Sequence, residues 1–192
     1  MGRRLGFDPG EALDAAMRIF WEKGYEGASL DDLTHAMGIN KPSLYRSFGN
    51  KQHLFQLVLR HYETQNLGFF RKALRHATAK AVVVDILSGY LRLATNHATP
   101  GGCLGINAAV ACSLDAEPVR TLLLERRLVY LEKLKGRLAQ AKAEGDLATH
   151  IDPSSFANLI MMLIAGSALQ AKAGIAPAVL AQAINLAVDS IF

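Results

Sequence analysis

The chain has 192 residues, of which 51% are hydrophobic and 20% charged, and a net charge of +4. This composition supports a filled core and excludes a disordered chain, and two cysteines are too few for a disulfide framework. The N-terminal residues include acids and lack the apolar run of a signal peptide. The longest apolar helix candidate, 156–169, is too short to span a bilayer. We therefore expect a cytoplasmic protein with no membrane partner.

Glycine and proline divide the chain into a series of helices. The first is expected to begin at Asp8-Pro9, where an N-cap residue precedes a proline at the first helical position, and to end near Gly24. No segment shows the alternating pattern of a convincing strand, so the expected fold class is all-α. Later helices are expected over 79–97, 103–113, 118–144, 153–173 and 177–191.

Residues 29–48 have the length and punctuation of a helix-turn-helix: a helix capped by Ser29, a turn at 38–40 and a short helix over 41–47. Such a unit places the start of its second helix in the major groove of DNA. No acid occurs from residue 33 to 62, so this stretch can follow phosphates without repelling them. The residues expected to contact DNA are Ser29, Asn40, Lys41, Pro42, Ser43, Tyr45, Arg46 and Lys51.

Short motifs within and around this unit follow one another in a defined order. They are Gly24-Tyr25, Ser29-Leu30, Met37-Gly38-Ile39, Leu44-Tyr45, Phe48, and Lys51 with Leu54-Phe55. In order and spacing they resemble the DNA-binding domain of the TetR family of regulators. The resemblance implies an all-α chain with a three-helix DNA-binding domain (1–50) and a helical ligand-binding and dimerising domain (51–192). Most members of that family are repressors released by a small effector.

The same resemblance assigns roles within the helix-turn-helix. It gives Tyr45 and Lys51 as phosphate contacts, although helix packing is an alternative role for Tyr45. Pro42 departs from the commoner glycine or small residue at its position, so any base contact from it is apolar. The groove-facing positions are Lys41, Ser43 and Arg46.

Residues 153–188 contain one charged residue, Lys172. Helices this apolar form either the core of the protomer or an interface with a partner. The resemblance favours a homodimer in which the last two helices pair with their symmetry mates, which suits a protein that reads two half-sites. The expected interface residues are Phe156, Ile160, Leu163, Ile184 and Leu186. Core packing is expected for most of an apolar row on the preceding helix: Leu124, Leu128, Leu131, Leu134, Leu138 and Ala141.

An effector pocket is not clearly marked in the sequence. Polar groups on apolar helices are candidates to line it, although each also suits a core or surface position. These candidates are Tyr90, His97, Asn107 and Tyr130.

Cys103 follows Pro100-Gly101-Gly102 and is expected at a helix N-terminus, where the helix dipole lowers the pKa of a thiol. A small buried hydrophobe is the alternative reading. The surrounding Gly-Cys-Leu and Asn-Ala-Ala pattern resembles a TetR subgroup, some of whose members respond to electrophiles or oxidants through cysteine. Cys112, nine residues along the same expected helix, is out of disulfide reach.

No arrangement of residues indicates catalysis, a cofactor or a metal. The chain lacks a phosphate-binding glycine loop, a His-Glu-x-x-His motif and a nucleophile elbow, and no cysteine–histidine set has zinc spacing. We expect a regulator that binds double-stranded operator DNA and a small-molecule effector. The alternative is a helical ligand-binding or interaction protein that does not regulate DNA.

Overall fold

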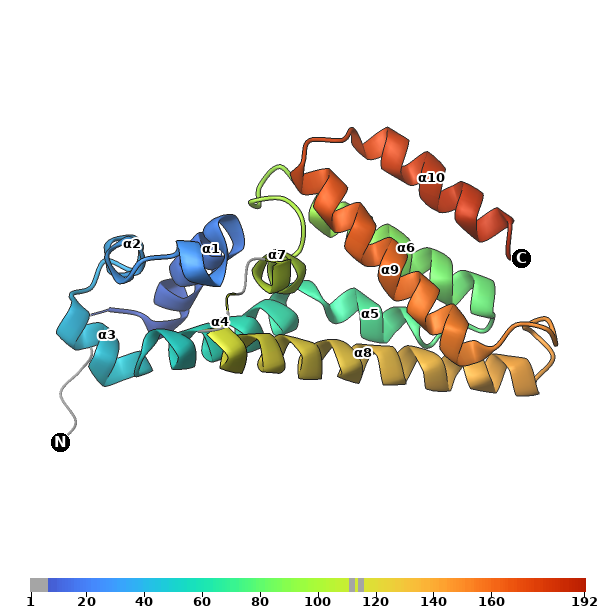
Figure 1. Ribbon diagram of the computed structural model, residues 1–192, viewed down its shortest axis with the longest axis horizontal. Coiled ribbons are helices and arrows are strands. Elements are labelled where there is room, and N and C mark those ends of the chain that lie inside the picture. Colours follow the sequence, from blue (N-terminus) through green and yellow to red (C-terminus); the bar gives the residue numbers. More distant parts are fainter. Residues whose placement is uncertain (1–6, 111–112, 114–115) are drawn as a thin grey trace.

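The structure is a computed structural model that describes residues 7–110, 113 and 116–192. In these residues the chain forms ten helices and no strand, which confirms the all-α expectation (Figure 1). The helices are α1 (Pro9–Gly27), α2 (Leu30–Ala36), α3 (Lys41–Phe48), α4 (Lys51–Asn66), α5 (Gly68–Ala73), α6 (Ala79–Ala94), α7 (Leu104–Val110), α8 (Glu117–Ala143), α9 (Pro153–Lys172) and α10 (Pro177–Asp189).

Side-chain caps fix where the first four helices begin. The Asp8 carboxylate accepts hydrogen bonds from the first turn of α1, and the Asn50 side chain caps α4. Ser29, the expected cap, forms a reciprocal capping box with Asp32 at the start of α2. The regular helix is interrupted where its end was expected, because Gly24 has a non-helical backbone with φ 73°. Beyond this kink, α1 continues as a short helical segment to Gly27.

The N-terminal helices pack on one aromatic core. Phe20 of α1 meets Phe55 of α4 edge to face, with ring centroids 5.1 Å apart, and both side chains are fully buried. Leu33 of α2 and Leu44 of α3 are also fully buried. The two short helices are therefore fixed on α1 and α4 through their apolar sides, which leaves the polar side of α3 exposed.

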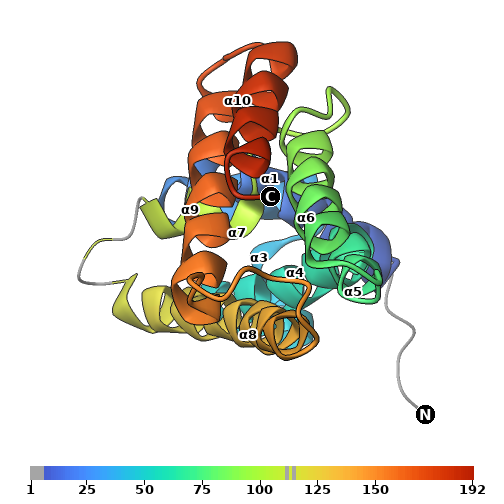
Figure 2. The same cartoon turned by 90° about the vertical axis from the view of Figure 1, so that its right-hand side faces the viewer.

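The C-terminal helices form a second packed region. In Figure 2, α6, α9 and α10 stand together above the long helix α8. The α9 helix packs most extensively against α6 and α8, and α10 covers α6 and α9. By length and composition alone α9 could cross a membrane, but a core helix of a soluble protein passes the same test.

The apolar row on α8 is only partly in the core. Leu134, Leu138 and Ala141 are fully buried, as expected, whereas Leu124 and Leu128 are 56% and 45% exposed. These two leucines are not covered because α9 crosses α8 at an angle, toward the C-terminal half of α8 (Figure 1). The short helix α5 was not predicted, since its N-cap residue, Leu67, provides no side-chain hydrogen bond that would mark its start.

Candidate functional site

The exposed side of α3 carries the residues expected to read DNA. Lys41, Pro42, Tyr45 and Arg46 are exposed, whereas Leu44 lies in the core. Tyr45 is 51% exposed, so the alternative of helix packing does not account for most of its surface. The helix α3 thus presents two cations and a phenol hydroxyl to solvent, and Ser43 beside them is half-buried.

Two of the expected DNA contacts also hold helix ends in place. The Ser29 hydroxyl donates to the Asp32 carboxylate at 2.7 Å and accepts from the Asp32 amide at 3.0 Å. The Asn40 side-chain oxygen accepts from the Ser43 amide at 2.9 Å. Ser29 therefore fixes the start of α2 and Asn40 the start of α3, and a direct DNA contact from either side chain stays a prediction.

An acidic side chain of α2 lies beside α3, and the sequence pattern did not reveal this contact. The Lys41 ammonium lies 2.8 Å from the Asp31 carboxylate on α2, and this partner raises the pKa of Lys41. Lys23 pairs in the same way with Asp32 at 2.7 Å. Asp31 precedes the acid-free stretch in sequence, but the turn between α2 and α3 brings it back beside Lys41. One of the cations expected to face the groove is thus paired with an acid in this structure.

Lys51 is the first residue of α4, which follows α3 after a two-residue turn. Its ammonium sits 4.6 Å from the centre of the Tyr25 ring, and partial burial lowers the pKa of Lys51 while Glu26 opposes that shift. The ring holds the ammonium beside α3, which suits a phosphate contact.

The N-terminal helices are hydrogen-bonded to the C-terminal region through residues near the end of α1. The Trp21 indole donates to the Gly101 carbonyl at 3.0 Å, and the Trp21 carbonyl accepts from the side chains of Asn107 and Lys172, both at 3.3 Å. Asn107 is buried and lies outside the large cavity described next, so the structure places it in this tie and not in the expected effector pocket.

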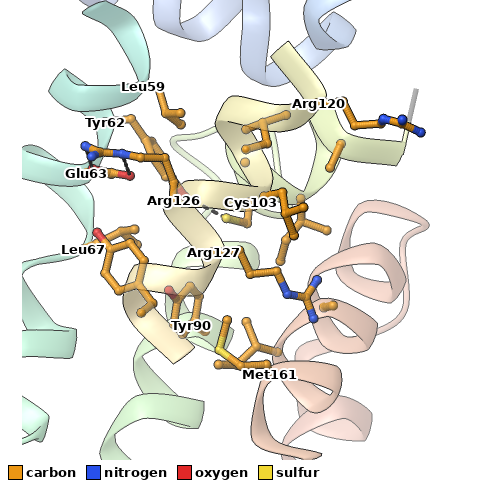
Figure 3. Close-up of a pocket in the computed structure, with 18 of the residues that line it drawn as sticks. Leu59, Tyr62, Glu63, Leu67, Tyr90, Cys103, Arg120, Arg126, Arg127 and Met161 are labelled. Atoms are coloured by element: carbon orange, nitrogen blue, oxygen red, sulfur yellow. Dashed lines mark hydrogen bonds and ion pairs between the residues drawn. The ribbon is translucent and has the colours of Figure 1, made fainter. Parts of the chain in front are cut away.

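A cavity of about 530 Å³ lies between α4, α6, α7, α8 and α9 (Figure 3). Its size is within the range of small-molecule sites. Three of the expected effector residues line it: Tyr90, Cys103 and Tyr130. His97 does not, because it is exposed beyond the end of α6, at a smaller hollow of about 350 Å³.

Cys103 is a buried thiol in the cavity wall. Its sulfur accepts a hydrogen bond from the Tyr62 hydroxyl at 3.2 Å. Burial raises the pKa of Cys103 and outweighs the opposing hydrogen bonds from Tyr62 and from the first turn of α7. The expected lowering of its pKa was therefore wrong, because desolvation exceeds the effect of the helix terminus. Cys112 lies outside the described residues.

An ion pair forms the polar part of the wall. The Arg126 guanidinium of α8 contacts the Glu63 carboxylate of α4 through two nitrogens, at 3.0 and 2.5 Å. This pair was not predicted, since its members are 63 residues apart in sequence. It joins α4 to α8 at one side of the cavity (Figure 3).

Comparison with known proteins accounts for both halves of the chain. The family model described as bacterial regulatory proteins, tetR family, matches residues 12–58. The model of the tetracyclin repressor-like C-terminal domain matches residues 67–187. The chain belongs to the TetR family. It is a DNA-binding transcriptional regulator, and this family is not one of enzymes.

Relatives and solved structures extend over nearly the whole chain. The HTH-type transcriptional repressor ComR of Escherichia coli is 32% identical over 175 residues, covering 90% of this chain and 83% of ComR. A regulator of Bacillus subtilis, YezE, is 31% identical over 149 residues, covering 77% and 76%. A cysteine mutant of the TetR family regulator CifR, complexed with 26-base-pair operator DNA, is 34% identical with a TM-score of 0.94, and the match covers 100% of both chains.

This TetR-family chain buries several residues that were expected at a dimer interface. Phe156, Ile160 and Ile184 are 4%, 0% and 6% exposed, so they pack within the protomer. They were misplaced because both faces of an apolar helix look alike in sequence. Leu163 is half-buried, whereas Leu186 is 70% exposed. The other large apolar side chains exposed on α9 and α10 are Leu159, Met162, Leu169 and Val179.

Among the described residues, no group of three or more histidine, cysteine, aspartate or glutamate side chains could hold a metal ion.

Proposed function

We propose that this regulator is a homodimeric repressor that binds palindromic operator DNA and is released by a small effector bound in the 530 Å³ cavity. The observation that carries the proposal is that one helix serves both sites. Leu59, Tyr62 and Glu63 of α4 line the cavity, and Lys51 begins the same helix beside α3. A ligand that moves α4 therefore moves the residues that meet DNA.

The proposal assigns separate roles to the N-terminal and C-terminal parts of the chain. Residues 1–50 form the DNA-binding unit and residues 51–192 the sensing and dimerising unit, in a protein that acts in the cytoplasm. Tyr45 and Lys51 hold phosphates and fix the register on the duplex. The residues that reach base edges in the major groove are Lys41, Ser43 and Arg46.

The cavity wall is in contact with α1 as well as α4. Tyr62 donates its hydroxyl to Cys103 in the wall, and its ring meets the Trp21 ring edge to face at 4.9 Å. Trp21 in turn belongs to the tie that joins α1 to the loop before α7 and to α9. A ligand that displaces Tyr62 thus acts on both helices that support α2 and α3.

The proposal is tested by fluorescence anisotropy with labelled fragments of the DNA upstream of the chain's own coding sequence. The wild-type dimer should prefer one palindromic fragment over random DNA, with half-sites centred about 34–36 Å or a multiple apart, and its affinity should fall steeply with salt. Small molecules that bind the cavity should then release it. Equal affinity for all fragments, or operator binding that no cavity ligand changes, would contradict the proposal.

A second release route is modification of Cys103, which the position of its sulfur in the cavity wall favours. In this route an alkylating electrophile bound in the cavity accepts the sulfur lone pair, its leaving group departs, and the thiol proton passes to solvent. Iodoacetamide should then release the operator from the wild type and leave Cys103→Ser bound. Equal release of both proteins would exclude this route and leave reversible binding in the cavity as the release mechanism.

A further inference from the structure

The charged side chains around the cavity do not balance. Three arginines of α8 and two glutamates line it. Glu63 pairs with Arg126, and Glu117 pairs with Arg120 at 2.5 Å. Arg127 lines the cavity and forms no hydrogen bond or ion pair with any residue that the structure describes. One positive charge at the cavity is therefore left without an acid.

The orientation of these arginines separates their roles. In Figure 3, Arg126 reaches toward α4 and Glu63, whereas Arg127 reaches the opposite way, toward α9 near Met161. Arg120 extends away from the other labelled side chains. Arg127 is thus the guanidinium positioned between α8 and α9, at the exposed edge of the cavity.

The rest of the wall is apolar or neutral. Leucine, isoleucine and methionine side chains make up much of it, and three tyrosines and Thr121 supply the hydroxyl groups. Burial raises the pKa of Tyr62 and Tyr90 well above the ordinary value and that of Tyr130 to about 12, so all three stay neutral at physiological pH. No wall group therefore supplies the missing negative charge.

We infer that the cavity binds an amphipathic anion, an aromatic or branched carboxylate or sulfonate whose apolar body lies against the leucines and tyrosines and whose charge meets Arg127. A guanidinium forms charge-assisted, often bidentate hydrogen bonds with such a group. The regulatory meaning of this inference rests on the proposed function. Its chemistry does not, because the affinity of the cavity for an anion is measured without DNA.

Two fluorescent probes that share one apolar skeleton test the inference. 1-Anilinonaphthalene-8-sulfonate carries a sulfonate, and N-phenyl-1-naphthylamine is its neutral counterpart. The sulfonate should bind the wild type more tightly than the neutral probe, and each should compete with the other. Arg127→Gln should weaken sulfonate binding about tenfold, the lower end expected for a charge-assisted hydrogen bond at an exposed edge, and leave the neutral probe unchanged.

Two further variants locate the effect. Lys133→Gln removes the same charge from α8 at an exposed position outside the cavity and should leave both affinities unchanged. Ala165→Trp fills the cavity from α9 and should abolish binding of both probes in the cavity, so that they no longer compete. A thermal melt confirms that this variant is folded. Equal sulfonate affinity in Arg127→Gln and wild type, or no preference for the sulfonate, would overturn the inference. Failure of the proposed function would instead appear as missing operator selectivity in the unliganded protein.

Discussion

Leu186 on α10 provides a sharp test of how two protomers meet. Its side chain is 70% exposed in the protomer, so Leu186→Glu should change protomer stability by no more than about 0.5 kcal/mol. At a two-fold interface each protomer contributes one copy, and burying a leucine stabilises by roughly 1.5–3 kcal/mol. Losing both copies removes roughly 3–6 kcal/mol, which weakens the dimer about 10²- to 10⁴-fold.

Sedimentation velocity over a range of micromolar to nanomolar concentrations measures this loss. Leu186→Glu should sediment as a monomer where the wild type is a dimer, with nearly the same melting temperature, and should bind the operator weakly. Ile160→Ala is the matched control on α9. Its fully buried side chain makes the variant about 2–5 kcal/mol less stable, yet its folded fraction should stay dimeric. If Leu186→Glu stayed dimeric down to the same concentrations as the wild type, α10 would not form the interface.

Three further predictions concern charge and protonation. Lys51→Gln should weaken binding to operator and random DNA alike and lower the salt slope by roughly one per protomer, whereas a loss confined to the operator would mark a base contact. Asp31→Asn frees Lys41 from its ion pair and should tighten DNA binding, most strongly at low salt; weaker binding in an anisotropy titration would contradict this. Because burial raises the pKa of Cys103, its alkylation by iodoacetamide, followed by peptide mass spectrometry, should keep accelerating beyond pH ~8.5, the ordinary thiol pKa. Tyr62→Phe removes a hydrogen bond that lowers the pKa of Cys103 and should slow alkylation at pH 8. A rate that levels off below pH ~8.5, or no change in Tyr62→Phe, would show an unperturbed thiol.

The elements that the sequence predicted correctly depend on local interactions. Asp8, Ser29 and Asn40 each accept from a backbone amide within three residues, so a short window of sequence contains everything that fixes these helix starts. The helix-turn-helix follows from the same caps together with the glycine between them.

What the sequence did not predict depends on how helices cross. The Glu63–Arg126 ion pair and the hydrogen bond from Tyr62 to Cys103 join residues that are 63 and 41 apart in sequence. Leu124 looks like Leu134 in the apolar row of α8, and only the crossing angle of α9 separates the exposed side chain from the buried one. Periodicity gives the apolar face of a helix but not the length over which a neighbour covers it.

The acceptor at the centre of the tie between α1 and the C-terminal region is the peptide carbonyl of Trp21. A main-chain oxygen is present whatever side chain occupies position 21, so no substitution there can delete it. Only its donors can be exchanged, and these lie 86 and 151 residues downstream, at Asn107 and Lys172. Neither donor lines the 530 Å³ cavity or belongs to α2 or α3. Substitutions at Asn107 or Lys172 can therefore change how firmly α1 is held against the C-terminal region, and so how readily a ligand displaces it. They leave the residues that meet the operator and those that line the cavity unchanged.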